Sequence, residues 1–180
     1  LFVVADAVGT RQPFFQERLI AAWRRGALSV DELVAALPED QLPAAGVDES
    51  IASLRKVIAR LEALDADTRA RVLEPLMTRL DDGHRHMVTV EELQRLQDGG
   101  VALGLHGKTH TPMRLAEDLD AELGGAREAL ARQLGQPRAR AESMSFPHGS
   151  FDAAIAQRAR EAGYELVFTS VPVLNPTGHG

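Results

Sequence analysis

One stretch of the chain, residues 101–110 with the sequence VALGLHGKTH, determines how the rest is interpreted. Its first five residues form a short apolar run typical of a buried strand, and two histidines follow directly. Residues four apart share one face of a helix, but Gly107 and the nearby Pro112 favour a loop at the strand end. Neutral imidazole is a common zinc ligand, so His106 and His110 are candidate metal ligands. A catalytic zinc ion usually has three protein ligands, and the pair alone is therefore an incomplete site.

Composition narrows the possible classes of protein. The chain has 180 residues, 44% of them hydrophobic, enough for one domain with a sizeable core. Its net charge of −6, without a dense basic stripe, argues against nucleic acid as the main partner. There is no cysteine, and hence no disulfide and no thiolate metal site. Neither a membrane span nor a signal sequence is visible. We expect a soluble protein, and the sequence does not indicate its compartment.

The two ends of the sequence suggest a fragment. Residues 1–4 are apolar and partly β-branched, as in the middle of a buried strand, and no Met precedes them. The last six residues, NPTGHG, have the composition of a loop. We therefore expect that N- and C-terminal parts of the domain lie outside this sequence.

Residues 11–87 are expected to be a helical insertion. Ser29 and Glu32 form a capping box, Asp48 and Asp65 are candidate helix caps, and Pro75 is expected to bend a helix. Apolar residues recur at helical spacing throughout this region, which favours a core between helices over a groove for a partner. The insertion could serve as a lid or as a surface for oligomerisation, and the sequence does not choose between them.

The stretch Asp81-Asp82-Gly83-His84-Arg85-His86 has two carboxylates and two imidazoles within six residues. Such a set could bind a metal ion. It follows a predicted helix rather than a strand, so no rigid element would hold its side chains in place. We interpret it as a helix end followed by a solvated loop.

From Val101 onward, strands and helices alternate. After a helix opened by the capping box of Thr89 and Glu92, we expect strands at residues 101–105, 143–146 and 164–169, with helices at about 115–134 and from 151 to 162. This order predicts an α/β fold with a parallel sheet or barrel and right-handed crossovers.

Ligands of such folds bind at the carboxyl ends of parallel strands. Several residues fall at or just after the ends of the predicted strands, and we expect them to converge: His106, His110, Pro147, His148 and Ser170.

Three blocks of this part resemble the polysaccharide deacetylase family, also called the NodB-homology domain. Residues 92–106 resemble the family's helix-Gly-strand entry to its His-[Ser/Thr]-x-x-His motif. Residues 145–152, SFPHGSFD, resemble its aromatic-Pro-Tyr-Gly-x-x-Asp stretch, and residues 159–169 resemble the helix-Gly-Tyr-strand that follows. The resemblance covers about residues 1–10 and 88–178 and leaves out the helical insertion.

The resemblance implies a single NodB-like deacetylase domain over residues 1–180, an incomplete distorted (β/α) barrel of mostly parallel strands. It implies a hydrolase acting on C–N bonds other than peptide bonds, which removes acetyl groups from a carbohydrate with the help of a divalent metal, zinc first of all. His106 and His110 would be its two imidazole ligands. Pro147, His148 and Gly149 would line the wall that binds the acetyl group and offers a backbone N–H to the oxyanion.

The sequence also departs from the family pattern. The family's Asp-Asp motif, with the general base and the third metal ligand, belongs before the strand at Leu1, and we expect it upstream of this chain. Gly107 replaces the usual Ser or Thr, and His148 stands where Tyr is usual. The late Leu-x-His motif, which supplies a general acid, has no clear match, because His179 is displaced. No catalytic residue is therefore assigned, and the chain by itself holds an incomplete metal centre.

Two alternatives stay open. The missing Asp-Asp segment and Gly107 suit a non-catalytic carbohydrate-binding or scaffold protein that keeps the fold. Residues 11–82 could also be a helical interaction module. The sequence does not identify the sugar, the linkage, N- versus O-deacetylation or the metal.

Overall fold

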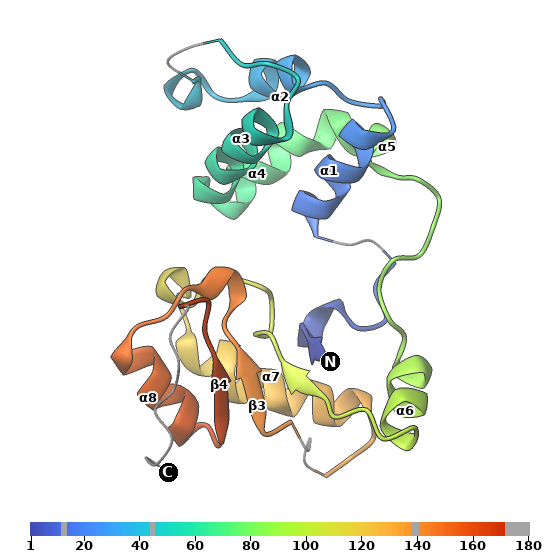
Figure 1. Ribbon diagram of the computed structural model, residues 1–180, viewed down its shortest axis with the longest axis vertical. Coiled ribbons are helices and arrows are strands. Elements are labelled where there is room, and N and C mark those ends of the chain that lie inside the picture. The colour runs from blue at the N-terminus through green and yellow to red at the C-terminus, as the bar shows by residue number, and fades with distance from the viewer. Residues whose placement is uncertain (12–13, 44–45, 138–140, 172–180) are drawn as a thin grey trace. The chain divides into compact units, whose positions relative to one another are not determined.

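The computed structural model describes residues 1–11, 14–43, 46–137 and 141–171. The chain divides into two compact units (Figure 1). The first, here called the sheet unit, consists of Leu1–Thr10 together with the chain from Met87 onward. The second, the helical unit, is Arg11–His86. Each unit has its own hydrophobic core.

The sheet unit contains four short parallel strands, β1 (Phe2–Val3), β2 (Gly104–Leu105), β3 (Ser143–Ser145) and β4 (Leu166–Phe168). They are ordered β1-β2-β3-β4, with Val3 opposite Leu105 and Leu105 opposite Met144. The predicted parallel sheet is confirmed, although each strand is shorter than expected. At β2, the Val101 N–H donates to Leu96 at the end of the preceding helix, so this residue belongs to the helix end and not to the strand.

Three α-helices belong to this unit: α6 (Val90–Asp98), α7 (Leu119–Gln133) and α8 (Ala153–Glu161). The capping box of Thr89 and Glu92 is present at α6 as predicted, and Asp118 and Asp152 cap α7 and α8. Single 3₁₀ turns lie between these elements, at η1 (Ala5–Ala7), η4 (Met113–Leu115) and η5 (Pro147–Gly149).

One face of the sheet packs on the helices. Side chains alternate across a strand, and the buried members of this face include Val3, Leu105 and Met144. They join residues of α7 and α8 such as Leu123 and Ile155 in one core. Leu93 of α6 also belongs to this core, and further buried residues, such as Met113 and Tyr164, come from the segments between strands and α-helices.

Two aromatic rings meet on the other face of the sheet. Phe2 of β1 and Phe168 of β4 lie on the two outer strands, and their ring centroids are 5.2 Å apart in an edge-to-face arrangement. Gly104 of β2 lies beside the Phe2 ring, and a Cβ atom there would come within 2.6 Å of it. The two rings therefore reach toward each other over the small residue Gly104.

The helical unit contains α1 (Phe15–Arg24), α2 (Val30–Ala36), α3 (Ile51–Ala63), α4 (Ala66–Leu73) and α5 (Met77–Leu80), with 3₁₀ turns η2 (Glu39–Gln41) and η3 (Glu74–Leu76). The bend predicted at Pro75 is confirmed, because Pro75 lies in η3 between α4 and α5. The apolar residues at helical spacing form the core of this unit, with Leu19, Leu33, Leu54 and Leu61 fully buried.

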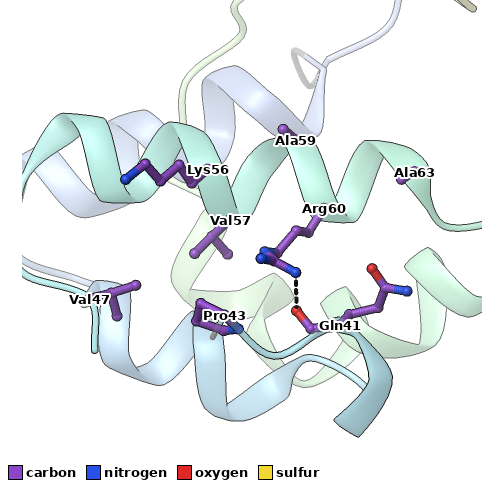
Figure 2. A pocket seen from close by; sticks show the side chains of 8 residues that line it. All are labelled: Gln41, Pro43, Val47, Lys56, Val57, Ala59, Arg60 and Ala63. Carbon is purple, nitrogen blue, oxygen red and sulfur yellow. Dashed lines mark hydrogen bonds between the residues drawn. The ribbon is translucent and has the colours of Figure 1, made fainter. Parts of the chain in front are cut away.

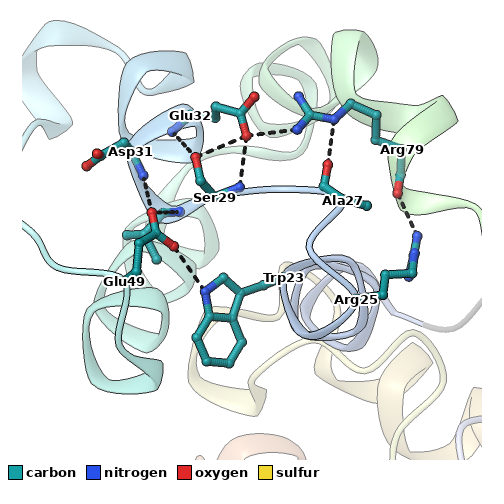
Figure 3. Close-up of polar contacts among 9 residues, drawn as sticks. Trp23, Arg25, Ala27, Ser29, Asp31, Glu32, Glu49 and Arg79 are labelled. Carbon is teal, nitrogen blue, oxygen red and sulfur yellow. Dashed lines mark hydrogen bonds and ion pairs between the residues drawn. The ribbon is translucent and has the colours of Figure 1, made fainter.

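Polar contacts fasten the ends of the helices to one another (Figure 3). The predicted capping box of Ser29 and Glu32 is present, and Glu32 also pairs with Arg79 at 2.8 Å. The side chain of Glu49 accepts hydrogen bonds from the Val30 N–H at the start of α2 and from the indole of Trp23. These contacts connect α1, α2 and α5 at one end of the bundle.

The prediction that Asp48 caps α3 is wrong. Ser50, and not Asp48, is its N-cap, and the Ser50 hydroxyl accepts from the Ser53 N–H at 3.2 Å. Asp48 instead accepts hydrogen bonds from both serine hydroxyls, each at 2.5 Å. The carboxylate lies two residues too early to reach the N–H groups of the first turn and supports the cap from outside.

The helical unit also has an open pocket of about 360 Å³ beside α3 (Figure 2). Apolar side chains such as Val57 and Pro43 line it, and Arg60 at its edge donates to the Gln41 carbonyl at 3.0 Å. Within the described parts of both units, no helix is long and apolar enough to cross a membrane.

Candidate metal centre

His106 is the first residue after β2, and its ring is held by the neighbouring strand. Its backbone N–H donates to Val3 at 2.7 Å, which continues the parallel ladder. Its ring Nδ1 lies 2.7 Å from the Ser145 carbonyl oxygen, at the end of β3. A carbonyl only accepts hydrogen bonds, so Nδ1 carries the proton. Nε2 then bears the lone pair, which is the arrangement found in histidines that bind a metal ion.

His110 and His148 lie next to His106. The ring centroids of His106 and His110 are 5.1 Å apart, and those of His110 and His148 are 4.7 Å apart. His106 and His110 belong to the loop after β2, and His148 belongs to η5, which follows β3. The structure thus brings together three of the side chains that follow the predicted strands.

Two of these histidines have an uncommon backbone conformation. His110 has φ 72° and His148 has φ 56°, and they are the only residues other than glycine with positive φ in the part of the chain that the structure describes. The left-handed region costs an L-residue about 1–2 kcal/mol. Such strain persists where the surroundings impose it, often at functional sites.

The surroundings keep the imidazoles of His106 and His110 neutral. Burial, together with smaller effects of the nearby His148 and His106, lowers the pKa of His110 to about 4. Burial also lowers the pKa of His106, with the hydrogen bond to Ser145 acting in the opposite direction. Both rings are therefore uncharged at neutral pH, which is the form that binds metal ions.

The pair fits two ligand positions of a metal ion. Two imidazoles that bind one tetrahedral zinc ion at about 2.0–2.1 Å have ring centroids about 5 Å apart, close to the 5.1 Å between His106 and His110. No group of three or more His, Asp or Glu side chains placed to hold a metal ion occurs among the described residues. The separation of the His106 and His110 rings is therefore compatible with two ligand positions on one ion.

The turn η5 forms one side of this cluster. Pro147 is buried and has no N–H, while the Gly149 N–H donates to Phe146 at 3.0 Å. Gly149 has φ 64°, and a Cβ atom there would lie 2.8 Å from the Ser170 Cβ. Ser170, which follows β4, therefore also reaches this edge of the sheet, whereas His179 lies outside the described residues.

The other predicted histidine cluster belongs to the helical unit. His86 Nε2 lies 2.9 Å from both carboxylate oxygens of Asp82, and the hydrogen bond to His86 lowers the pKa of Asp82 to about 2. The His84 and His86 rings are 6.5 Å apart. The segment after α5 has neither helix nor strand up to α6, which agrees with the interpretation of a loop.

Two contacts at the site were missed from the sequence. The first is the Ser145 carbonyl, which no side-chain pattern reveals. The second is Glu122 of α7, whose carboxylate accepts hydrogen bonds from the loop between His106 and His110. A signal for Glu122 did exist, since this carboxylate lies next to Leu123 on the apolar face of the predicted helix, where charged residues are rare.

Comparisons with known proteins identify the family of the chain. A family model described as polysaccharide deacetylase matches residues 74–167, more than half of the chain. No curated protein matches the chain. Among solved structures, a polysaccharide deacetylase from Bacillus cereus is similar with a TM-score of 0.43 and 16% identity, over 58% of this chain and 37% of that one. The Streptococcus pyogenes deacetylase PplD, solved in complex with acetate, has a TM-score of 0.41 and 19% identity, over 87% and 71% of the two chains.

Proposed function

Because the chain belongs to the polysaccharide deacetylase family, we propose that it takes part in the hydrolysis of acetyl groups on a carbohydrate, with a divalent metal ion bound by His106 and His110. The chain spans 37% of the length of the Bacillus cereus deacetylase. The observation that carries the proposal is the pair of neutral imidazoles whose ring centroids lie 5.1 Å apart at the carboxyl edge of a parallel sheet.

The two histidines would hold the ion from one side. His106 is anchored through Nδ1 to Ser145, so its Nε2 is the ligand atom. Zinc is the metal we propose, since it accepts nitrogen ligands in this arrangement. A bound ion of this kind lowers the pKa of its water from about 15.7 to about 7 and polarises the acetyl carbonyl.

The turn η5 would form the wall beside the acetyl group. We propose that Pro147, His148 and Gly149 line this wall and that the turn offers a backbone N–H to the oxyanion. A backbone donor in this position stabilises the transition state by about 3 kcal/mol. The left-handed backbone of His148 supports this role, because it turns the peptide away from its usual direction.

We further propose that the parallel sheet is part of a (β/α) barrel and that the helical unit is an insertion in a single deacetylase domain. The alternation of parallel strands with helices in the sheet unit supports a barrel. The division of the chain at Thr10 and Met87 supports an insertion.

Acetate release tests the proposed function. The natural protein that contains this sequence, supplied with Zn²⁺, should release acetate from N-acetylated or O-acetylated oligosaccharides. His106→Ala and His110→Ala should abolish the release, whereas His84→Ala in the helical unit should not change it. A wild-type protein that releases no acetate, or a His106→Ala variant as active as wild type, contradicts the proposal.

A non-catalytic carbohydrate-binding protein is the second candidate. It is favoured by one observation, the lack of a third suitable ligand beside His106 and His110 within the described residues. In that case, the natural protein binds an acetylated oligosaccharide with the same affinity before and after removal of metal by a chelator, and never releases acetate.

A further inference from the structure

The loop between the two candidate ligands is attached to α7 by one carboxylate. Glu122 Oε2 accepts from the Lys108 N–H at 2.9 Å and from the Thr109 N–H at 3.1 Å. Its Oε1 accepts from the Thr109 hydroxyl at 2.5 Å. All three donors thus belong to the residues that separate His106 from His110.

This carboxylate is almost completely removed from water. Glu122 is 6% exposed, among apolar neighbours such as Leu123 and Ala126. A buried carboxylate is stable only when hydrogen bonds replace its hydration. The loop supplies those bonds, so helix and loop depend on each other. Glu122 also lies in the first turn of α7, where the helix dipole favours negative charge.

The loop is shaped to admit the carboxylate. Gly107 has φ 78°, and a Cβ atom there would lie only 3.0 Å from Glu122 Oε2 and 3.2 Å from Pro147 Cγ. A side chain at this position would press against both the carboxylate and the turn η5. The absence of a hydroxyl at residue 107 therefore does not leave the loop unsupported, because Glu122 and Thr109 hold it from the other side.

We propose that Glu122 is a positioning residue of the metal centre, which fixes the loop so that His106 and His110 face one ion. His106 is held from the opposite direction by Ser145. The ring separation of 5.1 Å then depends on two anchors, one at each end of the loop. The metal in this inference is the one that the proposed function assigns to the pair.

The test compares a disruptive, a conservative and a control variant. Glu122→Ala removes every acceptor. Glu122→Gln keeps one oxygen for the two backbone N–H groups and an amide that can donate to the Thr109 hydroxyl, so it preserves the geometry without the charge. Glu128→Ala is the control, since Glu128 is exposed on the same helix. Thr109→Val, at an exposed residue, removes the hydroxyl hydrogen bonds to Glu122 Oε1 and to the Thr111 hydroxyl, with little risk to folding.

Two measurements are made on each variant: the hydrogen-exchange protection of the Lys108 and Thr109 amides without metal, and the affinity for Zn²⁺. We expect Glu122→Ala to lose the protection and to bind Zn²⁺ about 10–100-fold more weakly, as loss of an outer partner of a metal site does. Thr109→Val should weaken binding by a smaller factor. Glu122→Gln should stay within about threefold of wild type, and Glu128→Ala should equal it.

Three results overturn the inference. Glu122→Ala could keep wild-type protection of the two amides, or it could keep wild-type affinity for Zn²⁺. Glu122→Gln could bind Zn²⁺ as weakly as Glu122→Ala, which would show that the charge of Glu122 matters and its positioning of the loop does not. If Glu122→Ala does not fold, Thr109→Val with unchanged affinity overturns it. A wild-type chain that binds no Zn²⁺ contradicts the proposed function instead, and amide protection, which needs no metal, then decides the role of Glu122 alone.

Discussion

The imidazole rings of His110 and His148 lie 4.7 Å apart, and both residues have a left-handed backbone. Each therefore follows a strained turn that brings its ring to the same place from a different strand end. Because each left-handed residue costs about 1–2 kcal/mol, the contacts around the two turns must hold the rings at this edge of the sheet.

The backbone of His148 predicts an unusual preference for glycine. Glycine adopts φ 56° without the steric cost that any Cβ brings. We expect His148→Gly to be more stable than His148→Ala by about 1 kcal/mol, measured by urea unfolding. The same two substitutions at His86, which has no positive φ, should rank in the opposite order. An alanine variant at least as stable as the glycine variant at residue 148 would contradict the strained turn.

Burial of His110 predicts a stability that depends on pH. Its pKa is about 4 in the folded chain against 6.5 for an ordinary histidine. Between these two values the unfolded chain binds more protons than the folded chain, so the free energy of unfolding decreases as the pH falls from about 6.5 to about 4. His110→Asn should flatten this dependence. The measurement is the midpoint of urea unfolding across this range, with NMR titration of the ring; protonation of His110 near pH 6.5 in the folded protein would refute it.

The close approach of the Phe2 ring to Gly104 predicts that a side chain at residue 104 lowers the free energy of unfolding. A Cβ atom there would overlap the Phe2 ring at 2.6 Å and the Ser143 side chain. We expect Gly104→Ala to lower the free energy of unfolding by about 1–3 kcal/mol. Gly124→Ala is the matched control, since that glycine lies inside α7 with open space around it, and it should raise stability by about 0.5–1 kcal/mol. Equal stability of the two variants would show that Phe2 does not pack over Gly104.

The capping box of α2 predicts that its removal lowers the free energy of unfolding, which the fluorescence of the single tryptophan can measure. Ser29→Ala removes the acceptor of the Glu32 N–H and should lower the free energy of unfolding by about 1 kcal/mol. Trp23 lies in the same unit, bonded to Glu49 near the start of α2 (Figure 3). Its fluorescence during urea unfolding is the measurement. Arg55→Ala, an exposed change within α3, should leave the transition unchanged, and a Ser29→Ala curve that overlaps wild type would rule out the cap.

Much of the fold could be predicted from the sequence because local patterns and the structure agree. Alternating strands and helices predicted the parallel sheet, and the capping boxes at Ser29 and Thr89 are both present. The convergence of His106, His110 and His148 followed from topology alone, since parallel strands end at one edge. The polysaccharide deacetylase family was also identified in this way and is confirmed.

The rest depends on contacts between distant residues. The length of β2 was overestimated because the end of α6 holds Val101. Asp48 was assigned as a cap because carboxylates favour that position, whereas the register of the chain places Ser50 there. The role of Ser145 arises from a hydrogen bond to a residue far away in sequence, which no local spacing encodes. Glu122 is marked in the sequence only as a charged residue on the apolar face of its helix, and its partners are not.

Zinc binding by this chain is the most direct test of the central claim, that His106 and His110 form one metal-binding pair. Isothermal titration with Zn²⁺ should show one site at wild type, about tenfold or more weaker in His106→Ala and in His110→Ala, and unchanged in His84→Ala and His86→Ala. Binding that survives both substitutions in the sheet unit, or that disappears with those at His84 and His86, would contradict it.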